Sequence, residues 1–207
     1  MNEQDLINFE EDIASIYETG KIRAPIHLRS GNEAQLVEIF KDIKVEDYVY
    51  STWASHLHSL LKGVRPDIVK DAILEGRSIT LNFPSHNLYS SAIVGGTPSI
   101  AVGTAYALQK QNKTGRVYCF LGDMGFHTGI AYESIKYAIG HNLPITFVVE
   151  DNEKSVGTPT FDAWHMTTYS VYELMCKMAH GSKNVKIEYY KYESKYPHAG
   201  TGTFVEF

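Results

Sequence analysis

The segment that most constrains the fold of this chain runs from residue 116 to residue 156. It contains two short apolar runs, at residues 117–121 and 145–149, each ended by acidic or small residues. Short runs of this kind are typical of buried parallel strands. Apolar residues recur near helical spacing across residues 128–140. The segment is therefore predicted to form a right-handed β-α-β unit.

Polar residues follow both strands of this unit. Asp123 comes directly after the first strand, and Asn152 comes after the second. Because parallel strands point their carboxyl ends at one edge of the sheet, both side chains are expected in the crevice where open α/β sheets bind ligands. A carboxylate and an amide oxygen suit Mg²⁺ or Ca²⁺, which would also hold a diphosphate. The alternative is that Asp123 caps the following helix and Asn152 shapes a turn.

The motifs around these residues resemble a known family. Gly-Asp-Met-Gly at residues 122–125, followed later by Glu-Asp-Asn at 150–152, resembles the thiamin diphosphate motif. Upstream segments at residues 27–34, 53–63 and 93–107 resemble further segments of the α subunit of the first component of 2-oxo acid dehydrogenase complexes. They occur in the same order, and the resemblance covers roughly residues 26–159.

The resemblance implies a fold and a function. The fold is a three-layer α/β/α thiamin diphosphate-binding fold with a mostly parallel sheet. Residues 1–207 would form one diphosphate-type domain, with a helical extension over about residues 1–25 and a strand and tail over about residues 183–207. The function is that of an α-type subunit, which binds thiamin diphosphate through magnesium and acts on a 2-oxo acid with a β-type, pyrimidine-binding partner chain. The cofactor supplies the electron sink, and the protein positions it.

The resemblance also assigns site residues. Magnesium would be held by Asp123, Asn152 and the backbone carbonyl of Lys154. The implied cofactor-binding residues are, in chain order, Gly95, Gly122, Asp123, Met124, Gly125 and Asn152.

Two departures from the family concern the diphosphate. Met124 stands where the family has a glycine, so the turn must accommodate a side chain. Trp53 and Ala54 stand where the family has a tyrosine and an arginine, so the arginine that would touch the diphosphate is missing. The substitutes that the sequence offers are Lys62, Arg77 or a residue of a partner chain.

Histidines are the expected proton carriers near neutral pH. His56 matches a histidine of the family, and His86 lies roughly where the family has a loop histidine, so both are assigned catalytic roles. A structural or surface role is the alternative for each. His127 and His198 are weaker candidates, and the other histidines, His27 among them, are interpreted as structural.

The same motifs leave three other functions open. A split transketolase-like enzyme would transfer a ketol unit between sugars with the same cofactor. A non-catalytic subunit would keep the fold and lose cofactor binding, which Met124 and the missing arginine favour and which Asp123 and Asn152 disfavour. Another phosphate-binding α/β enzyme is the last alternative.

Composition limits the partners and the compartment. The formal charge of −5, without a basic run, argues against nucleic-acid binding. Cys119 and Cys176 lie far apart and suggest no disulfide framework, which fits a reducing compartment. Because the first residues are polar and acidic, with no apolar h-region, no signal peptide is expected, and because no stretch approaches about 18 apolar residues, no membrane span is expected. The expected location is cytoplasmic.

The rest of the chain is predicted from periodicity and from helix-ending residues. Thr97 is expected to cap the helix that follows it. Gly103 is unfavourable within that helix, so we expect close packing there, against a neighbouring helix or subunit or against the sheet. Helices are expected over residues 5–19, 32–43, 54–61, 66–75, 98–111 and 164–179, strands over 47–52 and 183–195, a loop over 77–89, and an edge strand or partner contact at 204–207.

Overall fold

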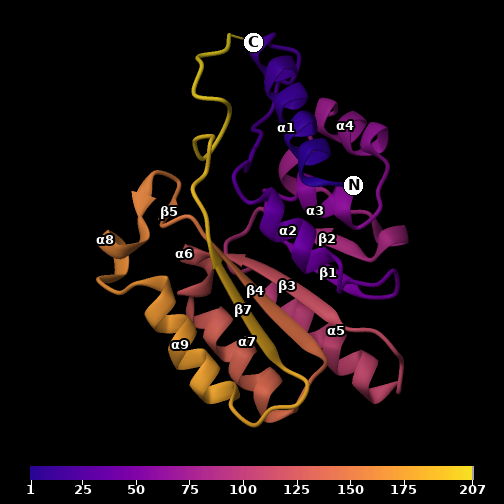
Figure 1. The fold of residues 1–207 in the computed structure, drawn as a ribbon, viewed down its shortest axis with the longest axis vertical. Helices are drawn as coiled ribbons and strands as arrows, with labels where there is room; N and C mark the ends of the chain where they lie inside the picture. Colours follow the sequence, from indigo (N-terminus) through magenta and orange to yellow (C-terminus); the bar gives the residue numbers. More distant parts are fainter. Residues whose placement is uncertain (207) are drawn as a thin grey trace.

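A computed structural model describes residues 1–206 and has a five-stranded parallel sheet at its centre (Figure 1). All four pairs of neighbouring strands are parallel, which confirms the expected fold class. The order β2-β1-β3-β4-β7 comprises β2 (Leu88–Ser90), β1 (Tyr48–Ser51), β3 (Val117–Gly122), β4 (Ile145–Asp151) and β7 (Lys186–Lys191).

Helices cover both faces of this sheet and complete three layers (Figure 1). Side chains alternate between the two faces along a strand. Tyr118 and Phe120 therefore pack against the first helical layer, and Cys119 and Leu121 against the second. The first layer contains α1 (Glu3–Glu18), α2 (Glu33–Phe40), α3 (His56–Leu61) and α4 (Pro66–Leu74), and the second contains α5 (Pro98–Lys110), α7 (Gly129–Gly140) and α9 (Thr168–Ala179).

The predicted β-α-β unit is present as β3, α7 and β4. The hydroxyl of Thr128 caps α7 by accepting a hydrogen bond from the backbone N–H of Ala131 over 3.3 Å. Between β3 and α7 the chain forms one further short helix, α6 (Asp123–Phe126). The side chain of Phe126 is 1% exposed and anchors α6 in the core, which leaves Asp123 directly at the end of β3.

The predicted loop over residues 77–89 is wrong at its end, where β2 begins. The segment contains two short 3₁₀ turns, η1 (Ser78–Thr80) and η2 (Pro84–His86). Leu88 then pairs with Val49 at the edge of the sheet and is fully buried. A strand of three residues is too short to show a periodic pattern, which is why the sequence did not reveal it.

The predicted helix over residues 164–179 is wrong at its start. After β4 the chain makes a small antiparallel hairpin from β5 (Lys154–Ser155) and β6 (Thr158–Pro159), and then α8 (Thr160–Trp164). His165 adopts φ 49° and ends α8, and the hydroxyl of Thr167 caps α9 through the N–H of Ser170. A left-handed residue between the two helices interrupts a pattern that reads as continuous in the sequence.

The C-terminal segment runs back along the first helical layer (Figure 1). The N–H of Lys195 donates to the carbonyl of Ser30, and the N–H of Gly200 donates to the carbonyl of Ile26. Residues 204–206 form no strand, so the predicted edge strand is absent there, and Phe204 is 91% exposed. Phe207 lies outside the described residues.

Two predictions for α5 need correction. Thr97 precedes α5, but its side chain makes no capping bond and instead contacts the thiol of Cys119. Gly103 is exposed, and a Cβ built on it would meet no atom within 4 Å in residues 1–206. Packing of Gly103 on the sheet is therefore wrong, while packing against a second subunit stays a prediction.

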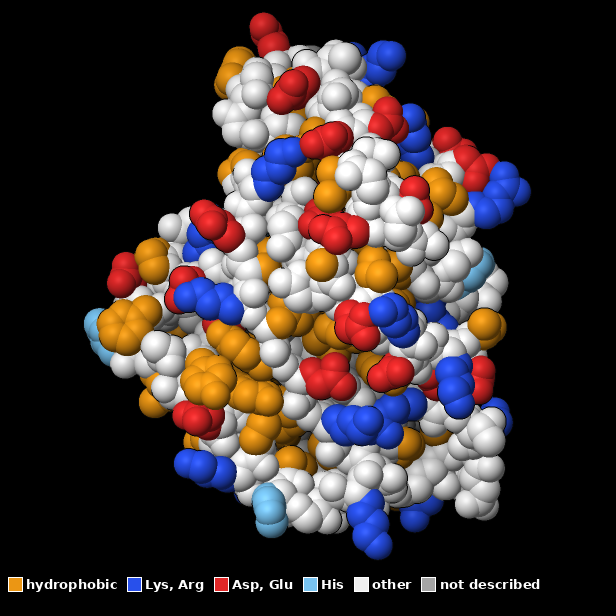
Figure 2. All heavy atoms as spheres, in the orientation of Figure 1, with side chains coloured by type: hydrophobic (Ala, Val, Ile, Leu, Met, Phe, Trp, Pro, Cys, Tyr) orange, Lys and Arg blue, Asp and Glu red, His pale blue; other side chains and the backbone are white. Residues whose placement is uncertain are grey.

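Charged side chains of both signs are interspersed on the face shown in Figure 2, and hydrophobic side chains gather over α8 and α9. Exposed apolar groups of this size are typical of contact surfaces. Within residues 1–206 no helix is both long enough and apolar enough to cross a bilayer. The exposed apolar residues of α8, α9 and the turn between them are Phe161, Trp164, Met166, Tyr169 and Leu174.

Candidate active site

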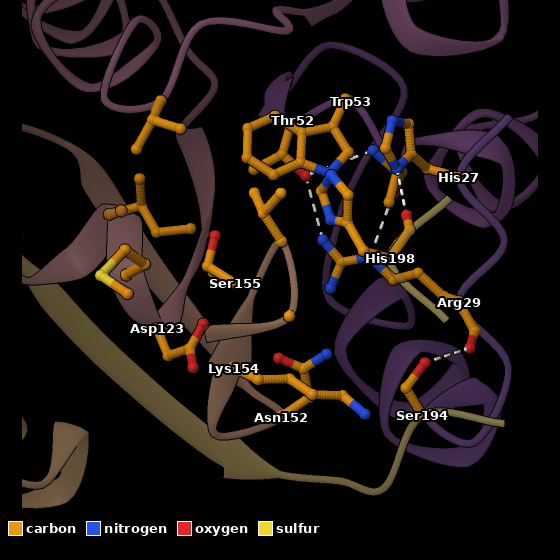
Figure 3. A pocket seen from close by; sticks show the side chains of 18 of the residues that line it. His27, Arg29, Thr52, Trp53, Asp123, Asn152, Lys154, Ser155, Ser194 and His198 are labelled. Atoms are coloured by element: carbon orange, nitrogen blue, oxygen red, sulfur yellow. Dashed lines mark hydrogen bonds between the residues drawn. The ribbon is translucent and has the colours of Figure 1, made fainter. Parts of the chain in front are cut away.

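A cavity of about 210 Å³ opens at the carboxyl ends of β1, β3 and β4 (Figure 3). Parallel sheets bind ligands at this edge. Asp123 and Asn152 both line the cavity, as expected from their positions after β3 and β4. The other residues that the sequence assigned to the cofactor or metal also line it, namely Gly95, Gly122, Met124, Gly125 and Lys154.

Asp123 is the buried acid of the cavity. Its side chain is 3% exposed, and Oδ2 accepts a hydrogen bond from the hydroxyl of Thr160 over 2.5 Å. Burial raises the pKa of Asp123 to about 6, against hydrogen bonds from Thr160 and from the amide of Met124. A carboxylate in this state gains most from a cation, because a cation would offset the cost of burying the charge.

The second half of the candidate metal site lies on the β5–β6 hairpin. Thr160 joins this hairpin to Asp123, because its N–H donates to the carbonyl of Glu153 over 2.9 Å while its hydroxyl binds the carboxylate. The loop that carries Asn152 and Lys154 is thereby held beside α6. The neighbouring Asp151 is occupied elsewhere, since it accepts hydrogen bonds from the N–H of Glu153 and the hydroxyl of Tyr189.

The small residues of the cavity leave room for a ligand. A Cβ built on Gly122 would meet nothing within 4 Å among the described residues. Gly95 has φ 70°, and its Cβ would lie 2.7 Å from Cγ2 of Ile130, so glycine is needed there for structural reasons. Met124 fits because it is the second residue of the short helix α6, and its sulfur accepts a hydrogen bond from Trp164 Nε1 over 2.9 Å.

A cation that the sequence did not identify, Arg29, lines the cavity. The guanidinium reaches the backbone carbonyl of Ala54, the position where the family arginine is missing, over 3.2 Å. The two substitutes within this chain that the sequence suggested are engaged elsewhere: Lys62 donates to the carbonyls of residues 44 and 45, and Arg77 pairs with Glu75. Neither lines the cavity.

Two histidines that were not assigned catalytic roles line the cavity together with Trp53. The rings of His27 and His198 lie 4.6 Å apart, and the ring of Trp53 lies 5.9 Å and 5.8 Å from them (Figure 3). Nδ1 of His27 donates to the backbone carbonyl of His198, so the neutral ring carries its proton on Nδ1 and leaves Nε2 as the acceptor. Burial lowers the pKa of His27 to about 4 and lowers the pKa of His198 as well.

His56 and His86 lie outside the lining of this cavity. His56 is 1% exposed, and its ring nitrogens bind Glu10 Oε1 and Ser78 Oγ, each over 2.8 Å. Serine, histidine and glutamate in this order resemble a hydrolytic triad. All three are at most 1% exposed and none lines the cavity, so no substrate can reach them. His86 lies in η2 beside the hydroxyl of Ser85. The catalytic roles assigned to both histidines stay predictions, and their positions do not favour them.

Known proteins match much of this chain. A model of the family described as dehydrogenase E1 component matches residues 1–178. The pyruvate dehydrogenase E1 component subunit alpha of Porphyra purpurea is 31% identical over 168 residues, which cover 72% of this chain and 48% of the relative. The subunit of the same description from Rickettsia prowazekii is 32% identical over 164 residues, which cover 74% and 50%. The chain thus spans about half the length of the curated relatives it matches.

These matches agree with the geometry. The three-layer arrangement around a parallel sheet is consistent with the thiamin diphosphate-binding fold of E1 domains. The chain belongs to the thiamin diphosphate-dependent 2-oxo acid dehydrogenase E1 family, on its alpha-subunit side.

Proposed function

We propose that this chain is the α-type subunit of a thiamin diphosphate-dependent enzyme that decarboxylates a 2-oxo acid and transfers the acyl group. The observation that carries the proposal is the meeting of Asp123 and Asn152 in one cavity at the ends of β3 and β4. The chain would hold the cofactor diphosphate through magnesium and would act together with a β-type partner chain. The cofactor, when bound, supplies the electron sink for the reaction.

The residues present fit a magnesium ion that also binds phosphate. Within residues 1–206 no three side chains of His, Cys, Asp or Glu gather in a way that could hold a metal alone. One buried carboxylate (Asp123), one amide (Asn152) and the backbone carbonyl of Lys154 leave further positions for ligand oxygens. Mg²⁺ typically binds through one or two carboxylates together with substrate phosphates.

His27 is the residue of this chain best suited to accept a proton in the cavity. Its low pKa keeps the ring unprotonated near pH 7, although it makes the ring a weaker base than an ordinary imidazole, and the hydrogen bond from Nδ1 to the carbonyl of His198 leaves Nε2 as the accepting atom. His198 lies at ring-contact distance and offers a second imidazole beside it. We assign proton transfer to this pair rather than to the enclosed His56.

Apolar residues at the cavity support a partner chain. Ile93, Val94 and Val156 line the cavity, yet they are 74%, 45% and 68% exposed. Apolar side chains left in solvent beside a binding site are typical of surfaces that another protein covers. We infer that a β-type, pyrimidine-binding subunit closes the site here.

The test is a measurement of magnesium-dependent cofactor binding. The chain is purified with its accompanying proteins, stripped of cofactor, and titrated with thiamin diphosphate in the presence and absence of magnesium. Asp123→Asn should weaken magnesium-dependent binding by about 100-fold or more, because even the loss of a group that supports a metal ligand costs roughly 10–100-fold. The matched control is Asp71→Asn, which alters an exposed aspartate of α4 and should leave binding unchanged.

Each outcome separates the alternatives. Binding by the wild type that Asp123→Asn abolishes, with a second chain and 2-oxo acid turnover, supports the proposal. Binding with turnover of a ketose, and none of a 2-oxo acid, would replace it by the transketolase-like alternative. Absence of binding with partner and magnesium present would refute it in favour of a non-catalytic subunit.

A further inference from the structure

The guanidinium of Arg29 lies on the wall of the cavity beside Ala54 (Figure 3). Its Nε donates to the Ala54 carbonyl over 3.2 Å, and its Nη2 donates to Thr52 Oγ1 over 3.0 Å. Both acceptors belong to the segment that follows β1, so the charge is held at the point where Ala54 itself offers only a methyl group. We propose that Arg29 is the residue that binds the cofactor diphosphate, an inference that rests on the proposed function.

The hydrogen bonds of Arg29 leave an N–H of Nη2 for a ligand. A guanidinium has five N–H groups. Nε donates to Ala54, Nη1 donates to Tyr192 Oη over 3.2 Å and forms an ion pair with Glu150 Oε2 over 2.9 Å, and Nη2 has Thr52 as its one partner among the described residues. The second N–H of Nη2 is therefore free. A buried donor that borders a cavity favours an acceptor there, and an anionic oxygen is the strongest one.

Glu150 holds Arg29 in place without using up its hydrogen-bonding capacity. Alternation along β4 points Glu150 into the first helical layer, where its side chain is fully buried. Its Oε1 accepts from the hydroxyl of Tyr190 over 2.5 Å and lies 3.2 Å from His58 Nε2. Its Oε2 forms an ion pair with Arg29 Nη1 over 2.9 Å. The carboxylate is thus shared among several donors, and the guanidinium is fixed from the side away from the ligand.

The charges across the cavity also fit a metal-bound diphosphate. Arg29 and Asp123 both line the cavity, so their opposite charges face one ligand space. No ion pair joins Arg29 to Asp123 in the described part of the chain. A carboxylate and a guanidinium that share a cavity without touching leave room for a ligand that coordinates the metal at Asp123 and presents anionic oxygens to Arg29.

The experiment compares ligands with and without the diphosphate. Calorimetric titrations with thiamin diphosphate and with unphosphorylated thiamin, both with magnesium, are made on the stripped complex. Arg29→Gln should weaken thiamin diphosphate binding by about 10- to 100-fold, as loss of a hydrogen bond between charged groups does, and leave thiamin binding unchanged. Arg77→Gln is the matched control, since Arg77 lies outside the cavity and pairs with Glu75.

Because Arg29→Gln leaves Glu150 buried without its cation, a second variant protects the test from a folding defect. Arg29→Gln combined with Glu150→Gln removes both charges, keeps polar side chains in both places, and should restore thermal stability but not the preference for the diphosphate. A double variant that is folded and still binds thiamin diphosphate like the wild type would refute the role of Arg29 alone. A wild type that binds neither ligand would refute the proposed function, and this inference with it.

Discussion

We expect His56→Phe to lower the free energy of unfolding by about 3–5 kcal/mol. The imidazole joins Glu10 Oε1 and Ser78 Oγ, and all three side chains are at most 1% exposed. Phenylalanine fills the space but leaves Glu10 Oε1 and the Ser78 hydroxyl without a partner, while Glu10 Oε2 keeps the backbone N–H of Arg29. Removal of one partner of a buried pair costs roughly 3–5 kcal/mol, and added apolar burial offsets only part of the hydroxyl's further cost. In a chain of this size the melting temperature should fall by about 10 °C.

Urea-induced unfolding followed by circular dichroism measures this change. Adding Glu10→Gln to His56→Phe removes the charge of the acid that has lost its imidazole partner and should recover about 2 kcal/mol. His86→Ala is the matched control, because its ring contacts the hydroxyl of Ser85 at the surface, and its effect should stay within about 0.5 kcal/mol. An unchanged unfolding free energy in His56→Phe, combined with lost turnover, would refute this reasoning and favour a catalytic His56.

Three further predictions follow from buried groups and glycines, each measured by equilibrium unfolding without ligand. Asp123→Asn should stabilise the metal-free chain by about 2 kcal/mol at pH 7.5. Burial raises the pKa of the Asp123 carboxyl to about 6, so the wild type loses stability as pH rises from about 4 through 6. An Asn variant that is no more stable than the wild type at pH 7.5 would contradict this. The wild type should lose about 1–2 kcal/mol of unfolding free energy, discounted for solvent at the cavity, as pH falls from 6.5 towards 4, because the folded state holds His27 neutral. His27→Gln should remove most of this loss, and an unchanged pH profile would count against the low pKa. Gly31→Ala should destabilise the fold by about 3 kcal/mol, since φ is 104° and the new Cβ would lie 2.1 Å from the Glu193 carbonyl oxygen. Its control is Gly103→Ala, which adds a methyl group at an open helix position and should stabilise the fold by up to about 1 kcal/mol.

The part of the site that the sequence predicted is the part built from consecutive elements. Asp123 and Asn152 each follow a strand of one β-α-β unit, and the rule that parallel strands share a carboxyl edge is enough to bring them together. Local signals also placed α7, whose boundaries agree with the prediction to one residue. The hairpin and α8 after β4 were missed because they depend on left-handed residues, Glu153 and Val156 as well as His165, that tolerate this backbone without being glycine.

The part that the sequence did not predict comes from segments distant in the chain. His27 and His198 are separated by 171 residues and meet because the C-terminal segment crosses the first helical layer. Periodic patterns predict local helices and strands, and they do not predict a contact between segments so far apart in the sequence. For His56 a matching motif position led to the catalytic assignment, which stays a prediction; the fold turns its ring toward Glu10, outside the lining of the cavity.

One signal in the sequence would have pointed to Arg29. Alternation along β4 places Phe147 and Val149 on one face of the sheet and Val148 and Glu150 on the other, so Glu150 must enter the first helical layer. A carboxylate in such a layer requires a buried cation or a set of donors, because its desolvation is otherwise too costly. In the structure that cation is Arg29, which forms an ion pair with Glu150 and also reaches the cavity at Ala54. Glu150 thus explains why Arg29 is buried where it is. Arg29 in turn places a positive charge at Ala54, where the residue itself has no long side chain to supply one.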